Sequence, residues 1–359
     1  EMFPYSFWTF FKSIPSWINE KLRVAKIIKK KLKYKGDIFF IEHHLCHAAS
    51  SYLVSPFSEA TILTIDGVGE WFTTTLGYAK DNNVELLKQI NFPHSLGLLY
   101  STVTAHLGFS VNNSEYKVMG LSPYGDMTKN NPYYQKFKKV INIKDDGSFE
   151  LDMSYFAYHY RMSMPSRTFI EEFGPIRKKE SKVEQKHKNI AAALQMVTEE
   201  AIFKMLNHLY EKIKCDNLCI SGGVALNSVA NGKILRNTPF KNIYIPSAAG
   251  DAGTSIGAAA YVYNTILNKK RDFVLRTAYL GPRFSTDEIK NFLQQNSITY
   301  HTFLDDNELV RTAAKLVYEN NVIGWFQERM EFGPRALGTR SILSNSTNTE
   351  MQNILNLKV

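Results

Sequence analysis

The sequence predicts an α/β fold, and three patterns carry that prediction. Residues 60–92 alternate apolar runs with turn signals, which predicts three consecutive antiparallel strands. Apolar side chains recur every three or four residues over 187–213, as in a long amphipathic helix. Two short apolar runs, NLCI and NIYI, then precede a small-residue helix over 252–267. This alternation of strands and helices is typical of α/β proteins with crossover connections.

The order of these elements suggests a more specific architecture. A three-stranded meander followed by helices opens each half of a ribonuclease-H-like fold. A strand over residues 37–41 is expected to precede the meander and to run into a helix, and a helical pattern follows over residues 94–109. Residues 126–186 are polar and predict mostly loops, with an aromatic cluster between Tyr155 and Tyr160.

The composition is that of an ordinary globular protein, with 44% hydrophobic and 21% charged residues in 359. An aromatic and then basic segment, 1–36, is expected to be helical, and a first domain is expected over residues 37–270. The pattern changes near Arg271, where a linker enters a second unit, 271–359. The chain therefore has room for two domains.

Charge and cysteine content limit the function classes. The net charge is +9, and basic residues crowd positions 21–35, which could touch nucleic acid or an acidic membrane or could be a solvated helix face. No apolar stretch is long enough to span a membrane. Three irregularly spaced cysteines favour a reducing, cytoplasmic setting over a disulfide framework.

A pair of histidines forms the first candidate site. In HHLCHAAS, a helix would place His43 and His47 on one face, about 6 Å apart at Cβ, where two neutral imidazoles can share a divalent metal. Asp251, among glycines at a predicted helix start, would complete a two-histidine, one-carboxylate set suited to iron(II). Hydrogen-bonded histidines and a helix-capping aspartate are the alternatives.

The turn after the first strand of the meander is a second candidate. In TIDGVGEW, Asp66 ends a buried strand, and Gly67 and Gly69 leave backbone N–H groups free to face a phosphate. Asp-Gly is also a common hairpin turn, so an ordinary turn is the alternative.

A second glycine turn offers a ligand more room. Gly222 and Gly223 in SGGVALN would let a ligand approach a helix start, and Asn227 offers a donor and an acceptor to a ribose or a purine. Tight strand–helix packing would explain the same glycines. Glu115 and Lys117 precede another glycine-containing loop.

Three arginines surround a stiff loop near the C-terminus. In QERMEFGPRALGTRS, Arg329, Arg335 and Arg340 flank Gly-Pro and could supply forked donors to phosphate oxygens. Surface arginines paired with Glu328 and Glu331 are the alternative.

Together these strings resemble one family. HHLCHAAS, TIDGVGEW, FPHSLGLLYS, SEYKVMGLSPYG, SGGVALN, GDAG and RMEFGPRALGTRSIL follow the order found in O-carbamoyltransferases. That family includes nodulation-factor, aminoglycoside, cephalosporin and saxitoxin-pathway enzymes. The resemblance runs from about Phe7 to Val359.

The resemblance implies two domains and two reactions. The first domain would be an actin-like ATPase fold of two ribonuclease-H-like halves, and the second would resemble threonylcarbamoyl-AMP synthase. Carbamoyl phosphate and ATP, accompanied by Mg²⁺, would give carbamoyl adenylate. The carbamoyl group would then pass to a hydroxyl of a small-molecule acceptor at an iron(II) site.

Carried over by motif, the resemblance assigns roles to individual residues. The expected metal ligands are His43, His47 and Asp251. The residues expected to hold nucleotide or phosphate groups are Asp66, Gly67, Gly69, Gly222, Gly223, Asn227, Arg329, Arg335, Arg340 and Lys358. Those expected to act in catalysis are His47, Lys117 and Arg335.

The chain departs from the family pattern at both ends. A strand-and-hairpin unit expected before Glu1 is missing, and the basic stretch expected beyond LNLKV is cut off. We therefore expect a chain truncated at both ends, with little or no transfer activity by itself.

Other functions stay open at this stage. An actin-fold sugar kinase or ATPase would leave RMEFGPRALG unexplained, and transfer of threonylcarbamoyl to tRNA fits the strings less well. A third alternative is binding of nucleic acid or a membrane surface through residues 21–35. We expect no nucleic-acid partner, and a homodimer is open. The acceptor is not indicated, although the 155–160 aromatics could line its pocket or a satellite core.

Overall fold

The computed structural model describes residues 4–351 and 354–355. Contacts within the chain divide it into two compact units, Glu1–Val274 and Leu275–Val359. The expected domain boundaries at residues 36 and 270 stay predictions.

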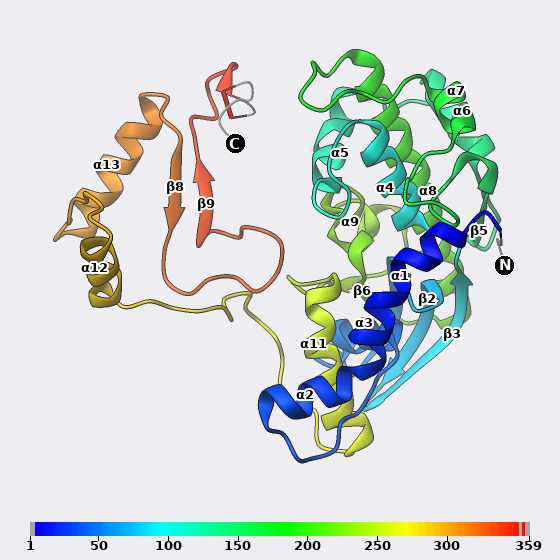
Figure 1. The fold of residues 1–359 in the computed structure, drawn as a ribbon, viewed down its shortest axis with the longest axis horizontal. Coiled ribbons are helices and arrows are strands. Elements are labelled where there is room, and N and C mark those ends of the chain that lie inside the picture. The colour runs from blue at the N-terminus through cyan, green and yellow to red at the C-terminus, as the bar shows by residue number, and fades with distance from the viewer. Residues whose placement is uncertain (1–3, 352–353, 356–359) are drawn as a thin grey trace. The chain divides into compact units, whose positions relative to one another are not determined.

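The first unit is built on a five-stranded mixed sheet in the order β3-β2-β1-β6-β7 (Figure 1). The strands β1 (Glu59–Gly69), β2 (Phe72–Lys80) and β3 (Asn83–Asn91) form an antiparallel meander. The strands β6 (Asn217–Ser221) and β7 (Asn242–Tyr244) continue the sheet parallel to β1. The predicted meander, the two short strands and the mixed α/β class are confirmed.

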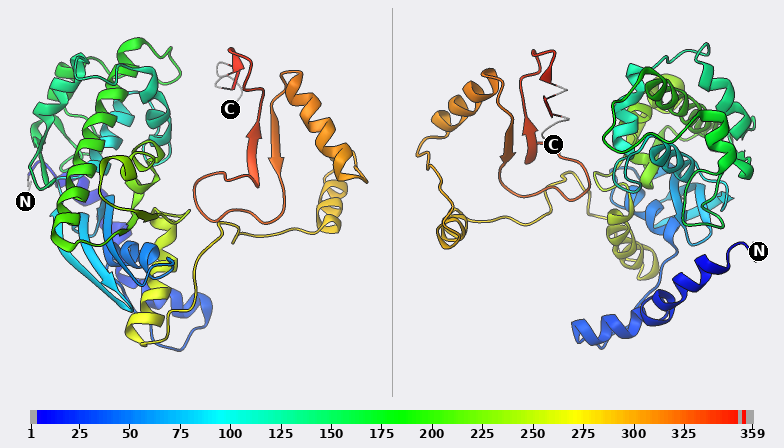
Figure 2. Two further views of the ribbon diagram at one scale, coloured as in Figure 1. Left: turned by 180° about the vertical axis from the view of Figure 1, so that it is seen from behind. Right: turned by 45° about the horizontal axis from the view of Figure 1, so that its top comes forward.

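Helices cover both faces of this sheet, as the two views in Figure 2 show. On one face, α3 (His43–Tyr52) and α11 (Asp251–Ala260) share a core with the sheet. On the other face lie α4 (Leu96–His106) and α8 (Gln185–Ile213), which belong to a larger core. Both faces of β1 are covered by helices, which explains why its sequence is a nearly continuous run of apolar residues.

Alternation along β1 decides which side chains face which layer. Leu63 and Ile65 belong to the core formed with α4 and α8, whereas Ile62 belongs to the core on the α3 side. Thr64 also faces α3, since its Oγ1 lies 2.6 Å from His44 Nδ1. Asp66 has the same parity, so its carboxylate is directed toward α3 and α11.

The helices α3 and α11 approach each other very closely. A Cβ atom added at Gly257 of α11 would lie 1.9 Å from the Cys46 carbonyl oxygen of α3, so glycine permits this packing. Glu42 caps the start of α3 by accepting hydrogen bonds from the backbone N–H groups of His44 and Leu45. Beyond α11 the chain continues as a π-helical turn over Tyr261–Ile266.

The N-terminal segment matches the expected helices but not the expected strand. It forms α1 (Phe7–Asn19), a 3-10 turn (Lys21–Arg23) and α2 (Val24–Leu32), and none of their residues is buried. The predicted strand over residues 37–41 is wrong, because this segment has no strand assignment in the structure.

Residues 126–186 are more ordered than predicted. They contain α6 (Pro132–Val140), the hairpin β4 (Ile141–Ile143) and β5 (Phe149–Leu151), and α7 (Arg167–Phe173). Phe137, Phe149, Phe156 and Phe169 are fully buried there. Of the predicted aromatic cluster, Tyr155 and Phe156 belong to the larger core and Tyr158 packs against it.

The remaining short elements of the first unit connect these layers. They are α5 (Glu115–Leu121), α9 (Ser228–Asn231), α10 (Ile234–Asn237) and the 3-10 turns Ser122–Tyr124, Met153–Tyr155 and Gly223–Leu226. No described helix has the length and apolar character needed to cross a membrane.

Between residues 275 and 350, the second unit contains two helices and one antiparallel strand pair. The helices are α12 (Thr286–Gln295) and α13 (Asp306–Tyr318), and the strands are β8 (Ile323–Phe326) and β9 (Arg340–Leu343). Residues 327–339, which carry most of the arginine-rich motif, join the two strands.

The close helix contact yields a stability prediction. Gly257→Ala should lower the free energy of unfolding by about 1–3 kcal/mol, since the added methyl group must displace the Cys46 carbonyl. Urea unfolding measures this. The matched control is Gly120→Ala in α5, where the new Cβ would meet nothing within 4 Å. It should be neutral or stabilising by up to about 1 kcal/mol. Equal effects of the two substitutions would contradict the packing argument.

Candidate metal centre

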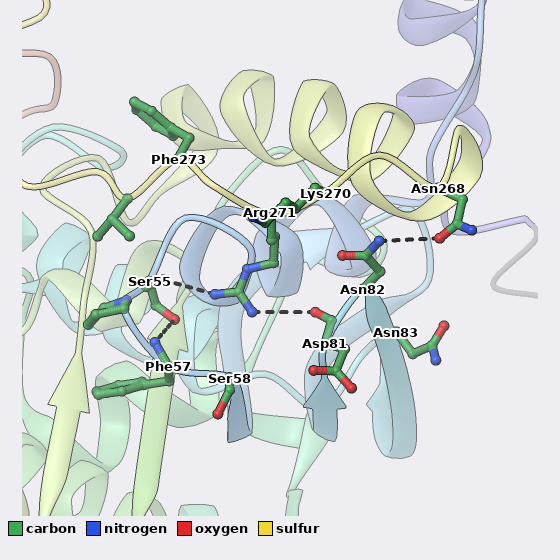
Figure 3. A pocket seen from close by; sticks show the side chains of 12 residues that line it. Ser55, Phe57, Ser58, Asp81, Asn82, Asn83, Asn268, Lys270, Arg271 and Phe273 are labelled. Carbon is green, nitrogen blue, oxygen red and sulfur yellow. Dashed lines mark hydrogen bonds between the residues drawn. The ribbon is translucent and has the colours of Figure 1, made fainter.

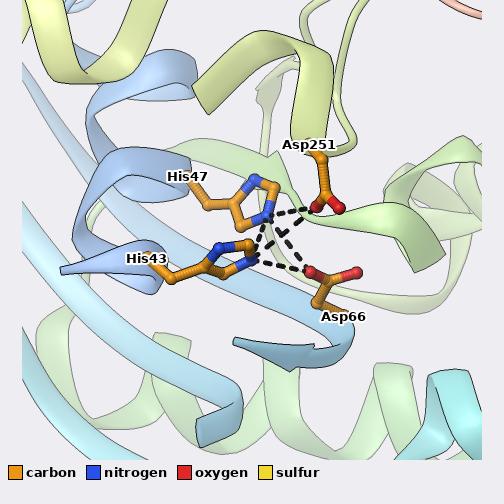
Figure 4. Close-up of side chains that lie close together, drawn as sticks. All are labelled: His43, His47, Asp66 and Asp251. Carbon is orange, nitrogen blue, oxygen red and sulfur yellow. Dashed lines mark hydrogen bonds and ion pairs between the residues drawn. The ribbon is translucent and has the colours of Figure 1, made fainter. Parts of the chain in front are cut away.

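Four side chains converge near the carboxyl end of β1 (Figure 4). His43 and His47 project from the first turns of α3, Asp251 is the first residue of α11, and Asp66 lies on β1. One ligand atom from each lies within 4.8 Å of the other three. Carboxyl ends of parallel strands are where ligand sites of open α/β sheets collect.

The separations match ligands of a single ion. His43 Nε2 and His47 Nε2 lie 3.0 Å apart, and Asp66 Oδ2 lies 2.9 and 3.3 Å from them. Asp251 Oδ1 lies 3.7 Å from His43 Nε2 and 3.5 Å from His47 Nε2. Ligand atoms about 2.1 Å from one ion, at angles of about 90–125°, are about 3.0–3.7 Å apart. The residues present therefore fit a divalent metal.

The charges of the centre favour a cation. Burial alone would lower the pKa of His47, but hydrogen bonds to Asp251 and Asp66 outweigh it and raise the pKa to about 9. Burial would raise the pKa of Asp66, yet its hydrogen bonds with His43 and His47 hold that pKa well below its usual range. Two carboxylates thus stabilise positive charge at the point on which both imidazoles converge.

The intervening histidine plays a different part. His44 is fully buried, with Nδ1 2.6 Å from Thr64 Oγ1 and Nε2 2.9 Å from the carbonyl oxygen of Phe72. Burial and the neighbouring His47 lower its pKa to about 4. Both ring nitrogens of His44 are engaged, so only His43 and His47 offer lone pairs to a metal.

Two glycines make room for the centre. A Cβ atom at Gly69 would lie 2.0 Å from Cδ2 of the His43 ring. Gly222 has a φ of +95°, and a Cβ there would lie 2.2 Å from the Ile65 carbonyl oxygen. The turn at Gly222 brings the Gly223 N–H within 3.1 Å of Asp66 Oδ1.

Asp66 contacts both histidines of the cluster. The structure places its carboxylate against both imidazoles, as a fourth candidate metal ligand, and its expected role in holding the nucleotide stays a prediction. Strand parity with Thr64 was the signal that could have shown this contact.

The other predicted nucleotide-binding groups surround the same strand end. Gly67 and Gly69 lie on β1 beside the cluster, and Gly222 and Gly223 follow β6, the next strand of the sheet. Asn227 lies farther along the same loop, where its amide is engaged in hydrogen bonds with Gln195 and with the N–H of Ala230. Contacts of these groups with a nucleotide stay predictions.

Lys117 and its neighbours lie on a separate helix. Glu115 begins α5 and accepts a hydrogen bond from the Ser101 hydroxyl at 2.9 Å. Lys117 is exposed, with Nζ 5.9 Å from the centre of the Tyr116 ring. Among the described residues, Lys117 makes no contact with the four residues of the metal cluster, and its catalytic role stays a prediction.

In the second unit, a buried carboxylate organises the arginine-rich loop. Glu331 is 3% exposed, and its Oε1 accepts hydrogen bonds from the N–H groups of Leu337 and Thr339 at 2.7 and 2.9 Å. Its Oε2 lies 3.2 Å from Arg340 Nε. Arg340 therefore helps to hold the loop by pairing with Glu331, and the carboxylate of this pair is buried and not at the surface.

The other basic residues of this motif differ in their surroundings. Arg329 donates to the Gly281 carbonyl oxygen at 3.0 Å, and the Arg335 carbonyl oxygen accepts a hydrogen bond from Arg340 at 3.3 Å. Lys358 lies outside the described residues. Phosphate binding by these side chains stays a prediction.

A hollow of about 580 Å³ lies at the opposite end of β1 (Figure 3). Ser58, which precedes the strand, lines it, together with Asp81 and Arg271. The Arg271 guanidinium donates to the carbonyl oxygens of Leu53, Tyr52 and Ser55, so it ties the linker to α3. This hollow is separate from the candidate metal centre.

Comparison with known proteins gives two family matches. A model described as the carbamoyltransferase N-terminus matches residues 5–260, and one described as the carbamoyltransferase C-terminus matches residues 314–359. The first match alone covers more than half of the chain and includes all four residues of the cluster.

Individual relatives match nearly the whole chain. The uncharacterized protein sll1178 of Synechocystis is 44% identical over 98% of this chain and 59% of its own length. The nodulation protein NolNO of Sinorhizobium fredii is 33% identical over 93% of this chain and 47% of its own length. The chain thus spans about half the length of these relatives. Among solved structures, T. kodakarensis HypF aligns over 71% of this chain and 40% of its own, with 15% identity and a TM-score of 0.37.

The cluster geometry predicts one divalent ion per chain. Replacing a residue that only hydrogen-bonds to a metal ligand typically weakens metal affinity by about 10- to 100-fold. Loss of a ligand itself, in His43→Ala or Asp66→Asn, should therefore weaken Co²⁺ binding at least about 100-fold. Titration with Co²⁺, followed by visible absorbance, measures this. His208→Ala, a histidine of α8 outside the cluster, should bind as the parent does. Unchanged affinity in Asp66→Asn would remove Asp66 from the ligand set.

The buried carboxylate of the second unit predicts a pH effect. Burial would raise the pKa of Glu331, but hydrogen bonds from Thr339 and Leu337 outweigh it and lower the pKa to about 2 from 4.5. This stabilisation is fully present above about pH 4.5 and is lost as the pH falls through about 2. The stability difference between the parent and Glu331→Gln should therefore shrink across that window, as measured by urea unfolding. The exposed Glu328→Gln should show little difference at any of these pH values.

Proposed function

This chain belongs to the carbamoyltransferase family, and from that premise we propose that it forms the metal-binding half of an O-carbamoyltransferase. The proposed reaction moves a carbamoyl group onto a hydroxyl of a small-molecule acceptor. Since the chain spans 59% and 47% of two relatives, the proposal concerns the activity of the whole protein.

The convergence of His43, His47, Asp66 and Asp251 is the observation that carries this proposal. The four residues come from three separate elements, α3, β1 and α11. A helix cap or an isolated hydrogen bond would need only one or two of these side chains, whereas a metal site needs all of them at one point. When bound, a first-row divalent ion such as Fe²⁺ would act as a Lewis acid toward a carbonyl or hydroxyl oxygen.

The residues of the chain would prepare this site in three ways. His43 and His47 would each present an Nε2 lone pair to the ion. Because Asp66 and Asp251 raise the pKa of His47, its imidazole would have to release a proton when the ion binds. Asp66 and Asp251 would balance the charge of the ion. The glycines of the loop after β6 have no side chains and would let the donor approach the strand end closely.

We place the nucleotide beside this centre and the phosphate chemistry in the second unit. The proposed donor is carbamoyl adenylate, formed from carbamoyl phosphate and ATP with Mg²⁺. Gly67, Gly222 and Gly223 would border the adenylate, in a domain proposed to have the actin-like ATPase fold. The loop stabilised by Glu331 would present Arg329 and Arg335 to phosphate oxygens.

Mass spectrometry of acceptor alcohols tests this function. Incubation of the purified full-length protein, of which this chain spans about half by comparison with its relatives, with carbamoyl phosphate, ATP, Mg²⁺ and Fe²⁺ should add one carbamoyl group to a competent alcohol. Asp251→Asn should lower the rate at least about 100-fold, because a displaced or missing ion removes the proposed electrophilic assistance. Omission of ATP should abolish the product.

A control variant and one contrary product complete this test. His208→Ala should retain the parent rate, since His208 lies outside the cluster. ATP-dependent phosphorylation of the alcohol, without a carbamoyl product, would replace the proposal by a kinase function.

A further inference from the structure

One buried amide in the first unit has every hydrogen-bonding capacity filled. Gln195 on α8 is fully buried. Its Nε2 donates to Glu199 Oε1 at 2.9 Å and to Asn227 Oδ1 at 3.1 Å. Its Oε1 accepts from Asn227 Nδ2 at 2.9 Å and from the Tyr100 hydroxyl at 3.1 Å. An amide has two donors and two acceptor lone pairs, so this network is complete.

The network fixes the far end of the glycine loop. Gln195 and Asn227 form a reciprocal amide pair, although they are 32 residues apart. Asn227 Oδ1 also accepts from the N–H of Ala230 at 3.0 Å, which holds the turn into α9. Glu199 is fixed in turn by Lys233, whose Nζ lies 2.7 and 2.8 Å from its two oxygens.

The near end of the same loop touches the metal centre. The Gly222 N–H donates to the Ala249 carbonyl oxygen at 2.8 Å, and the Gly223 N–H lies 3.1 Å from Asp66 Oδ1. The other oxygen of Asp66 contacts His43 and His47. The loop is therefore pinned at Asn227 by Gln195 and contacts Asp66 at Gly223.

We propose that Gln195 is a positioning residue for the candidate metal centre: it holds loop 222–227 so that the Gly223 N–H orients the Asp66 carboxylate. The inference rests on the proposed metal role of Asp66. Groups that hydrogen-bond to a ligand fix its orientation and its basicity, and their loss commonly weakens metal binding by about 10- to 100-fold.

The network also changes the interpretation of Asn227. Both lone pairs of its Oδ1 and one of its two N–H groups are already used. A ribose or purine could meet at most the remaining N–H group. The main action of Asn227 is thus to hold the loop in place.

Two substitutions on the same helix separate positioning from simple packing. Gln195→Met keeps the length and bulk of the side chain but removes all four hydrogen bonds. Thr198→Val is the matched control, because Thr198 is also fully buried on α8 and its hydroxyl bonds only to the Leu194 carbonyl among the contacts that the structure describes. The measurements are the Co²⁺ dissociation constant and hydrogen exchange of the amides of residues 222–227.

Gln195→Met should weaken Co²⁺ binding about 10-fold and speed amide exchange in the loop, and Thr198→Val should change neither. Parent-like binding and exchange in Gln195→Met would overturn the inference. If the parent protein takes up no Co²⁺, the metal role of Asp66 is wrong, while the exchange comparison still decides whether Gln195 holds the loop. If Gln195→Met does not fold, Tyr100→Phe, which removes a single hydrogen bond, should give a smaller shift in the same direction.

Discussion

The contact of one carboxylate with two imidazoles is the interaction on which the rest of this site depends. Asp66 meets His43 and His47 through one oxygen and the Gly223 N–H through the other. It thereby joins α3, β1 and the loop after β6, three segments that the chain order keeps apart. Asp251 adds a second carboxylate, and the resulting concentration of negative charge explains why protonation of His47 is favoured.

Much of the supporting architecture follows from this contact. The imidazoles reach Asp66 because α3 packs against the sheet. The Ser221 hydroxyl holds α3 in place by donating to the His47 carbonyl oxygen at 2.6 Å. Thr64, one step before Asp66 on the same face, holds His44. His47 and Asp66 are therefore embedded in a buried polar layer, whereas the Asp251 side chain is 77% exposed.

The regular elements of the first unit could be predicted from sequence because their signals are local. Apolar periodicity identified the meander and α8, and helical spacing placed His43 and His47 on one face. Asp251 was a candidate because an acid at a helix start beside glycines is a local pattern as well.

What the sequence did not show depends on contacts between distant residues. Motif reasoning grouped Asp66 with the nucleotide-holding glycines and did not show that its carboxylate contacts the histidines. The partnership of Gln195 and Asn227 has no local signature, and the segment 37–41 has strand-like residues without strand pairing. In residues 126–186 the elements are too short for periodicity to reveal, and buried aromatics hold them together instead.

The close contact between Gly257 of α11 and the Cys46 backbone of α3 has a consequence for protein engineering. Because backbone meets backbone there, the spacing between the candidate ligands of α3 and α11 depends on main-chain geometry as well as on their side chains. A designer who wished to graft this centre into another scaffold would have to transplant the crossed helix pair and the end of β1 as a single block. Copying the identities of the four candidate ligands alone would not reproduce their spacing.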